Sequence, residues 1–579
     1  MGISKWMTWR AVMTVGAVYT AFFLAGCSDG GGSGGSASST AASSQAKKAK
    51  PLTCAQLNGL SIPAGEIGLP TTGAVVTATQ TIAASGTGFS ALGAYCLVSG
   101  SIMPVDPTAP NIDFQLALPA QWNSKTLMIG GGGFDGTIPA VAGNLQLGPT
   151  NALLPLGRGY AVFGSDSGHQ DPTGGGSFSV NQEAYNNFAG DALKKTRDTS
   201  LYLVRAFYAR NPVRQYFAGG STGGRESLTV IQRWPQDWDG AIALYPAWNF
   251  TELTLQQLNA TEAFAAPGAY LDTAKRTVLF NAALQACDAL DGASDGIISN
   301  VLGCYQTFNP ATATYNGVAL RCPGGVDTGD TCLSDAQIAA LTTMDSPLIF
   351  NYPLASGQTS YPGYNVFIAD TGINNPNPAE AIVTSLALGS VQPSFPLPAG
   401  TMFDGVISDQ FIRYTVADNT SLDSLTFNAS NPGAFASRLS DLSSLDAINP
   451  DLTPFASKGG KLLIAHGTAD LTVATRATEY YFQLMQANMG VDSVDNFVRF
   501  YEIPGLQHAF STVFNASWDQ LTALENWVER GIDPATNQIV TDTIGVPGRT
   551  RPLCRYPSWP KYNGSGDINA AASFTCVMQ

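Results

Sequence analysis

A glycine-rich pentad surrounds the residue best placed to act as a nucleophile. Ser221 stands in the run Gly219-Gly220-Ser221-Thr222-Gly223, which has the form G-x-S-x-G. This form is typical of a sharp strand-to-helix turn, where glycines leave room beside a serine held in a strained conformation. An apolar run at 215–218 precedes the serine and a helical pattern at 225–234 follows it. The pattern predicts that Ser221 is the nucleophile of an acyl-transfer enzyme.

A serine becomes a useful nucleophile only beside a base, and the chain has 3 histidines. In an α/β hydrolase the acid and then the histidine follow the serine along the chain. His169 precedes Ser221, so its order is wrong. His508 follows the last apolar run and is the predicted base, and Asp470 is predicted to orient its imidazole. His466, directly after a buried strand pattern, is predicted to have a structural role.

Backbone amides are expected to stabilise the oxyanion that forms when the serine attacks. Thr222 follows the nucleophile and is predicted to supply one amide. Four consecutive glycines, 130–133, follow the apolar run at 125–129. We predict Gly130 as the second donor, with Gly131 as the next candidate. The alternative is that the glycines form only a flexible turn.

A second cluster of chemically active residues is acidic. Asp288, Asp291 and Asp295 lie close together, and two intervening glycines allow the chain to curl around one point. Hard oxygen ligands at this density suit Ca²⁺, which takes six to eight of them. The spacing is not that of an EF-hand. The alternative is a solvated acidic turn.

The elements expected to position these residues are strands. Apolar runs bounded by glycine alternate with helical patterns, which indicates an α/β fold with a parallel sheet covered on both faces. The runs lie at 125–129, 160–163, 215–218, 239–244, 461–465 and 497–503. Between them, residues 247–452 have weak periodicity. We therefore predict a core in two parts, 52–246 and 453–579, interrupted by an insertion at 247–452, and not two domains in series.

The N-terminal residues have the pattern of an export signal. Residues 11–24 are mostly apolar, but they are fewer than the roughly 20 residues that a transmembrane helix needs. The segment ends Leu24-Ala25-Gly26-Cys27, which resembles the bacterial lipobox. We predict a lipoprotein signal peptide at 1–26, a lipidated Cys27 and a flexible Gly/Ser-rich tether at 27–51. The alternative is an ordinary signal peptide with a chance cysteine.

Composition excludes some partners and predicts the compartment. The net charge of −14 opposes binding to nucleic acid, and 44% hydrophobic residues indicate a globular chain. With Cys27 lipidated, eight cysteines remain, and an even number in an exported chain predicts disulfides. Eight cysteines allow 105 connectivities. The simplest joins neighbours: Cys54–Cys96, Cys287–Cys304, Cys322–Cys332 and Cys554–Cys576.

Together these motifs resemble the tannase and feruloyl esterase family, which includes mono(2-hydroxyethyl) terephthalate hydrolases. The resemblance rests on the glycine run at 130–133 and on five further motifs. These are Ser221-Thr-Gly-Gly-Arg225, Cys287-Asp-Ala-Leu-Asp-Gly-x-x-Asp-Gly296, His466-Gly-x-x-Asp470, Pro504-Gly-x-x-His508 and Arg549-Thr-Arg-Pro-Leu-Cys554. It implies an α/β-hydrolase core with a large inserted, calcium-binding lid. It also implies the triad Ser221, Asp470 and His508, and it agrees with the four neighbour disulfides.

The resemblance completes the predicted calcium site and also shows a departure. It implies that the carbonyls of Ala293 and Ile297 join the three aspartates as ligands. The family usually has cysteines immediately before the nucleophile and after the base, joined by a disulfide. Gly220 and Ala509 stand there instead. We expect packing to supply the missing rigidity, at some cost in thermal tolerance, and we expect cysteines introduced at both positions to form the bridge.

The implied activity is hydrolysis of esters of aromatic, phenolic acids, such as feruloyl or galloyl esters, through an acyl-enzyme. Aromatic residues of the insertion are expected to hold the planar acyl group. Phe411, Arg413 and Tyr414 are the predicted substrate-binding residues. A terephthalate monoester is the alternative substrate, with Arg413 as the cation for its carboxylate. An alternative of another class is a lipoprotein that binds phenolic ligands without turnover. The only predicted binding partner is this small substrate. We expect contact with a membrane only through the N-terminal lipid anchor, and the sequence leaves the oligomeric state open.

Overall fold

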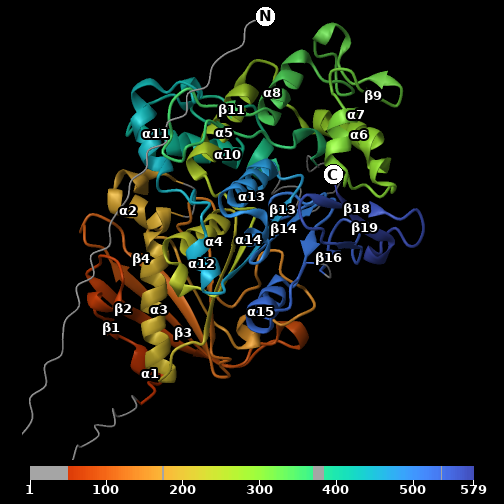
Figure 1. Cartoon of the computed structure of the whole chain (residues 1–579). Helices are drawn as coiled ribbons and strands as arrows, with labels where there is room; N and C mark the ends of the chain where they lie inside the picture. The colour runs from red at the N-terminus through yellow and green to blue at the C-terminus, as the bar shows by residue number, and fades with distance from the viewer. Residues whose placement is uncertain (1–49, 172–174, 370–383, 536–537, 579) are drawn as a thin grey trace, which may run out of the picture. The chain divides into compact units, whose positions relative to one another are not determined.

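A ten-stranded mixed sheet forms the centre of the chain (Figure 1). The computed structural model describes residues 50–171, 175–369, 384–535 and 538–578. The predicted signal peptide, Cys27 and nearly all of the tether lie outside these residues. Within the described part, no helix combines the length and the apolar composition of a membrane span.

The six predicted apolar runs all form parallel strands of this sheet, which confirms the α/β class. Their order across the sheet is β6-β5-β7-β8-β13-β14. Their bounds are β5 Lys125–Ile129, β6 Ala161–Ser165, β7 Arg214–Gly220, β8 Gly240–Leu244, β13 Lys461–Gly467 and β14 Val498–Ile503. Because all six strands run in one direction, the residues that follow them meet at one edge of the sheet.

Four antiparallel strands, which the sequence patterns did not predict, extend the sheet beyond β6. They are β1 Ser61–Ile62, β2 Gly73–Ile82, β3 Tyr95–Met103 and β4 Ile112–Pro119. Burial alternates residue by residue along β3, with one face packed and the other partly solvated. Such strands lack the continuous apolar run by which the parallel strands were recognised.

Helices cover both faces of the sheet. One face packs against α3 (Ala192–Tyr208), α4 (Thr222–Arg233) and α13 (Thr475–Met489), whose Leu203, Leu228 and Phe482 join one apolar cluster with the strands. The other face packs against α15 (Gln520–Arg530) through Leu524 and Trp527. The remaining short helices are α1 Cys54–Leu57, α2 Gln182–Asn186 and α14 Val491–Asp495.

A long segment lies between two neighbouring strands. β8 and β13 pair in the sheet, although residues 245–460 separate them. The regular structure of this segment is mostly helical, with α5 Phe250–Ala265, α6 Thr273–Cys287, α7 Val301–Thr307, α8 Asp335–Asp345, α10 Phe403–Gln410, α11 Ala436–Ser443 and α12 Thr453–Ser457. It also has the two-residue strands β9 Thr314–Tyr315, β10 Val318–Ala319, β11 Leu348–Ile349 and β12 Ser360–Tyr361. Most of its buried apolar residues belong to one cluster that includes α5.

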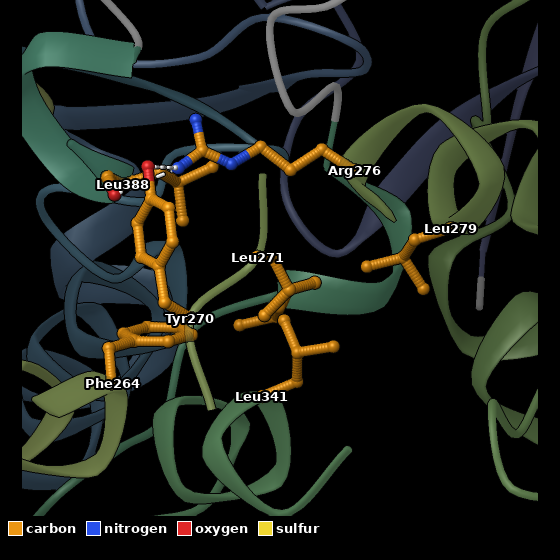
Figure 2. Close-up of a pocket in the computed structure, with 8 residues that line it drawn as sticks. Phe264, Tyr270, Leu271, Arg276, Leu279, Leu341 and Leu388 are labelled. Carbon is orange, nitrogen blue, oxygen red and sulfur yellow. Dashed lines mark hydrogen bonds between the residues drawn. The ribbon is translucent and has the colours of Figure 1, made fainter. Parts of the chain in front are cut away.

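A small pocket inside this segment is structural. Figure 2 shows Phe264, Tyr270 and Leu271 around it, with the guanidinium of Arg276 at one side. Arg276 donates to the Tyr270 hydroxyl at 3.0 Å and to the carbonyls of Leu388 and Gly389 at 3.0 and 2.8 Å. The volume of about 10 Å³ holds no more than one water molecule. The hydrogen bonds of Arg276 therefore join separate chain segments, and the pocket has no room for a substrate.

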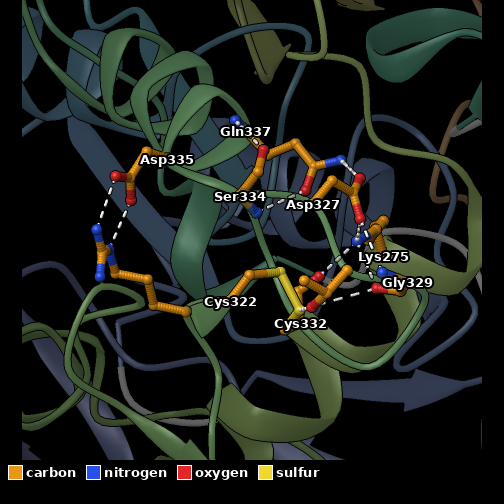
Figure 3. Close-up of a disulfide and its surroundings, with 10 residues drawn as sticks. Lys275, Cys322, Asp327, Gly329, Cys332, Ser334, Asp335 and Gln337 are labelled. Carbon is orange, nitrogen blue, oxygen red and sulfur yellow. Dashed lines mark hydrogen bonds and ion pairs between the residues drawn. A yellow bond between two sulfur atoms is a disulfide. The ribbon is translucent and has the colours of Figure 1, made fainter. Parts of the chain in front are cut away.

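The four predicted disulfides are confirmed. They join Cys54 to Cys96, Cys287 to Cys304, Cys322 to Cys332 and Cys554 to Cys576. Beside the third bridge (Figure 3), the buried ammonium of Lys275 donates to Asp327 at 2.7 Å and to the Gly329 and Cys332 carbonyls at 2.6 and 2.7 Å. Disulfides of this number are typical of proteins that fold outside the cytosol.

The chain ends in two small antiparallel sheets beside the main one. The strands are β15 Ala516–Ser517, β16 Ile539–Asp542 and β17 Thr550–Pro552, and then β18 Ser558–Tyr562 and β19 Phe574–Met578. Two arginines from this region reach the acidic loop. Arg549 donates to the Asp295 carbonyl at 2.8 Å, and Arg551 forms an ion pair with the Asp295 carboxylate.

Candidate active site

The nucleophile motif forms the expected sharp turn. β7 ends at Gly220, α4 begins at Thr222, and Ser221 between them has φ 61° and ψ −123°. A Cβ at Gly219 would lie 2.5 Å from the Gly223 carbonyl oxygen, and one at Gly223 would lie 2.9 Å from the Gly131 carbonyl oxygen. The glycines are therefore needed because backbone segments approach one another closely around the serine.

Three strand ends bring Ser221, Asp470 and His508 together. His508 Nε2 lies 2.9 Å from Ser221 Oγ, and His508 Nδ1 lies 2.8 Å from Asp470 Oδ2. The residues follow β7, β13 and β14, whose carboxyl ends share one edge of the sheet. A serine, an imidazole and a carboxylate in this line form the geometry of a Ser-His-Asp triad.

The Asp470 carboxylate is fully buried and has four donors. Its Oδ1 accepts the amides of Thr472 and Val473 at 2.8 and 2.9 Å. Its Oδ2 faces His508, and also His466 Nε2 at 3.2 Å. Burial alone would raise the pKa of Asp470, but the charge of His508 and the hydrogen bonds from both histidines outweigh it and hold the pKa well below its usual range. The carboxylate therefore stays ionised and keeps the His508 imidazole oriented.

His466 supports Asp470 and lies away from the serine. Its Nε2 faces two acceptors, Asp470 Oδ2 and the Val473 carbonyl at 3.0 Å, so this nitrogen carries the proton. Its Nδ1 lies 2.9 Å from the Thr478 hydroxyl. This agrees with the predicted structural role. His169 is also buried elsewhere, stacked on Phe178 at a centroid distance of 3.8 Å.

The predicted oxyanion donor Gly130 is wrong. Its amide donates to the Ala218 carbonyl at 3.0 Å and so continues the sheet, while the Gly131 amide donates to Glu226 Oε2 at 3.1 Å. The amides of Gly132 and Thr222 have no acceptor within the described residues, and both residues line the cavity at Ser221. Because residues 130–133 are all glycine, the sequence does not indicate which of their amides is free to act as the oxyanion donor.

Two buried acids, which no motif in the sequence indicated, support this glycine loop. Asp135 and Glu226 are 6% and 2% exposed. Burial and the charge of Glu226 raise the pKa of Asp135, and burial raises the pKa of Glu226. Two carboxyls in contact share a proton, and Glu226 also accepts the Gly131 amide. The pair thus fixes the loop that presents Gly132.

A cavity of about 190 Å³ opens at Ser221 and His508. Its apolar wall comes from Phe250 and Leu253 of α5 and from Phe403 and Ile407 of α10, and its polar lining includes Asp404. These lining residues carry no distinguishing motif in the sequence, so only the packing of α5 and α10 over the sheet edge identifies them.

The structure does not bring the predicted substrate-binding residues to this cavity. Phe411 is buried and packs edge-on against Phe250 at 6.0 Å. Arg413 pairs with Asp409 at 2.9 Å and donates to the Thr420 carbonyl. Tyr414 does not line the cavity either. These three residues were predicted from their aromatic or cationic type alone. Their positions in the helical turn Phe411–Val416 place them outside the lining of the cavity.

Gln146 and Tyr245 fill the space where the family bridge was expected. A Cβ at Gly220 would lie 2.0 Å from Gln146 Oε1 and 2.6 Å from the Tyr245 ring. Tyr245 donates to Gln146 Oε1 at 2.7 Å, and its ring packs edge-on against His508 at 4.7 Å. Cysteines at 220 and 509 would therefore bond only if Gln146 and Tyr245 moved.

The acidic loop forms a separate site. Asp288 Oδ1 accepts the amides of Asp295 and Gly296, and Asp291 Oδ1 accepts the amide of Ala293 at 2.8 Å. Asp291 Oδ2 is buried and has no partner within the described residues. Burial, with the charges of Asp295 and Asp288, raises the pKa of Asp291 to about 6. In the described part of the chain, no three His, Cys, Asp or Glu side chains are grouped as a metal site.

Comparisons with known proteins agree with this geometry. Residues 96–577 match the family described as "Tannase and feruloyl esterase". The chain belongs to the tannase and feruloyl esterase family. An uncharacterized esterase of Agrobacterium fabrum is 37% identical, with 90% of this chain and 93% of that protein covered. The mono(2-hydroxyethyl) terephthalate hydrolase of Piscinibacter sakaiensis is 30% identical, with 84% and 85% covered.

A solved structure of the family has the same fold. Feruloyl esterase B from Aspergillus oryzae superposes with a TM-score of 0.72 at 24% identity, over 89% of this chain and all of that one. The family match and the relatives named as esterases show that this tannase and feruloyl esterase family member is a carboxylic ester hydrolase. Ser221, His508 and the cavity are where ester chemistry is expected.

Substitutions at Gly132 test the revised oxyanion donor. Gly132→Pro removes the amide, and removal of one such donor lowers kcat by about 10²- to 10³-fold. Gly132→Ala keeps the amide, and its Cβ would meet nothing within 4 Å, so we expect kcat near that of wild type. Steady-state kinetics on a methyl ester of an aromatic acid measures both. Equal losses in the two variants would show that the amide is not the donor.

Proposed function

We propose that the chain is a serine esterase for esters of phenolic acids, of the feruloyl esterase or tannase type. The observation that carries the proposal is the hydrogen-bonded line from Ser221 through His508 to Asp470, at the floor of a cavity with an apolar wall.

The geometry suggests the order of the chemical steps. Ser221 Oγ attacks the ester carbonyl while His508 Nε2 takes its proton, and Asp470 stabilises the resulting imidazolium. The amides of Gly132 and Thr222 stabilise the oxyanion. His508 then protonates the leaving alcohol and activates the water that hydrolyses the acyl-enzyme.

The lining of the cavity favours a neutral aromatic acyl group. Phe250 and Phe403 offer ring surface to a planar acid. Burial, together with the nearby charge of Asp470, raises the pKa of Asp404 well above its usual value. A raised pKa favours the protonated acid, which can donate a hydrogen bond to a phenolic hydroxyl or methoxy oxygen.

The same lining disfavours the alternative substrate, a terephthalate monoester. A free carboxylate would lose its hydration in the cavity, and among the described residues that line the cavity none is a Lys or Arg that could compensate for its charge. Arg413, the predicted cation, is already bonded to Asp409 and to the Thr420 carbonyl. One relative is named as a mono(2-hydroxyethyl) terephthalate hydrolase, so we include this ester in the test below. Phenolic esters are our first choice.

We also propose that residues 247–452 form a lid over the active site and that the acidic loop within it holds Ca²⁺. The chemistry of the donors fits, because Asp291 carries a buried carboxylate oxygen without a partner and a raised pKa. Asp288, Asp291 and Asp295 would hold the ion with the carbonyls of Ala293 and Ile297. Bound calcium would neutralise the mutual repulsion of these carboxylates and so stabilise the loop.

We propose further that the mature chain begins at a lipidated Cys27 and is exported to the bacterial outer membrane, or to the periplasm or the outside. The four disulfides support export. The alternative function is non-catalytic: a lipoprotein that binds phenolic compounds without hydrolysing an ester. The hydrogen bond between Ser221 and His508 disfavours this alternative.

Turnover of three esters tests class and substrate together. We expect wild type to hydrolyse methyl ferulate or methyl gallate faster than mono(2-hydroxyethyl) terephthalate, because the described lining of the cavity offers no cation to the free carboxylate. Ser221→Ala should lose nearly all activity on each, since the nucleophile is gone. If Ser221→Ala were as fast as wild type, or if the terephthalate ester were preferred, the corresponding half of the proposal would fail.

Substitutions at Asp404 test acyl recognition. Asp404→Leu removes one neutral hydrogen bond and should raise KM for the phenolic ester about three- to tenfold, whereas Asp404→Asn retains a donor. Because a raised pKa keeps the acid neutral only below that pKa, KM of wild type should rise toward alkaline pH, and KM of Asp404→Asn should not. Parallel pH profiles of KM in the two enzymes would contradict this role.

Calcium removal tests the acidic loop. Dialysis against a chelator should lower the melting temperature, because the carboxylates then repel one another, and Ca²⁺ should restore it. Asp291→Asn should reduce the difference between the two states. An unchanged melting temperature of wild type after chelation would contradict the site.

A further inference from the structure

Asp470 stands on a buried loop that belongs to neither a strand nor a helix. Residues 468–474, which we call the acid loop, connect the end of β13 at Gly467 to the start of α13 at Thr475. All residues of the acid loop are buried. Buried backbone groups need hydrogen-bond partners, and a loop outside the sheet and the helices must find them elsewhere in the chain. These partners decide where the Asp470 carboxylate points.

Two donors from the segment between β8 and β13 meet on one peptide group of the acid loop. Gln257 Nε2 and the Tyr364 hydroxyl both donate to the Thr472 carbonyl, at 3.0 and 3.3 Å. The same peptide group carries the Val473 amide, which donates to Asp470 Oδ1 at 2.9 Å. Because a peptide is planar, holding its carbonyl also fixes the direction of its N–H. Linked hydrogen bonds polarise one another, so the bonded carbonyl makes the Val473 amide a better donor.

The same segment also holds the two ends of the acid loop. Asn365 Nδ2 donates to the Thr468 carbonyl at 2.9 Å. At the other end, the Tyr361 hydroxyl accepts the Ala474 amide at 3.2 Å. Side chains of the segment between β8 and β13 therefore hold the acid loop on both sides of Asp470.

Tyr364 allows this support to be tested apart from substrate binding. Its side chain is buried, and burial is the main cause that raises its pKa well above the usual value, so the hydroxyl keeps its proton and stays a donor. Tyr364 is not among the described residues that line the catalytic cavity, whereas Gln257 is. A change of the Tyr364 hydroxyl therefore reaches the reaction through the acid loop and not by contact with the substrate.

We propose that Tyr364 and Gln257 are positioning residues for the catalytic acid: together they hold one peptide of the acid loop, and the amide of that peptide holds Asp470 toward His508. The segment between β8 and β13 then supports the catalytic acid as well as forming the apolar wall of the cavity. The inference rests on the proposed function, because it assigns a support to the proposed triad.

The test measures kcat and KM on whichever of the three esters named above wild type hydrolyses fastest. Tyr364→Phe removes only the hydroxyl and should lower kcat about three- to tenfold with KM unchanged, since the cavity lining stays intact. Gln257→Met removes the other donor and should also lower kcat. The double variant should lose more than the product of the two losses, because the buried Thr472 carbonyl then has neither donor.

A matched control is available in the same segment. The Tyr352 hydroxyl is buried and has no partner within the described residues. Tyr352→Phe therefore makes the same chemical change without removing a hydrogen bond, and it should leave both kcat and KM unchanged.

Removal of the acid shows whether Tyr364 acts through it. Asp470→Ala keeps the residual activity that the oxyanion site supplies. In this background Tyr364→Phe should have no further effect on kcat, because the group through which Tyr364 acts is absent. A merely structural role of Tyr364 would lower kcat by the same factor in both backgrounds.

The outcomes separate this role from the proposed function. If Tyr364→Phe keeps the wild-type kcat, changes KM alone, or costs the same factor with and without Asp470, the positioning role is wrong while the esterase stands. If wild type hydrolyses none of the three esters, the proposed function fails and the positioning role with it. A melting temperature of Tyr364→Phe close to that of Tyr352→Phe shows that kcat reports on the acid and not on the fold.

Discussion

The buried Asp470 carboxylate is the charge on which the rest of the active site depends. A carboxylate without solvent is stable only when donors compensate for lost water, and here two histidines and two backbone amides do so. The charge holds the His508 imidazole toward Ser221. It also adds to the effect of burial, which is the larger cause of the raised pKa values of Asp404 and Tyr245. The buried Asp470 charge therefore favours the protonated form of both neighbouring groups.

Close backbone packing is the second constraint. Gly219 and Gly223 let β7, α4 and the glycine loop approach to distances that no Cβ tolerates. The same approach fixes the amides of Gly132 and Thr222 beside Ser221. Glu226 of the buried Asp135–Glu226 pair accepts the Gly131 amide and so holds the glycine loop in place.

The two sides of the catalytic cavity come from different parts of the chain. The apolar wall is built by α5 and α10 of the segment between β8 and β13, whereas Gln146, Ser221 and His508 lie in loops at the edge of the sheet. The inserted segment and the sheet edge therefore both contribute to the surface of the cavity.

The sequence alone determined the chemistry that depends on local patterns. Ser221, Asp470 and His508 were predictable because each follows an apolar run, and parallel strands place their carboxyl ends together. The disulfides followed from neighbour pairing. Only the tertiary structure decided which glycine amide is free and which aromatic rings face the cavity. Those choices depend on contacts between residues distant in the chain, such as Gly130 with Ala218 and Gly220 with Gln146, and no local pattern records such contacts.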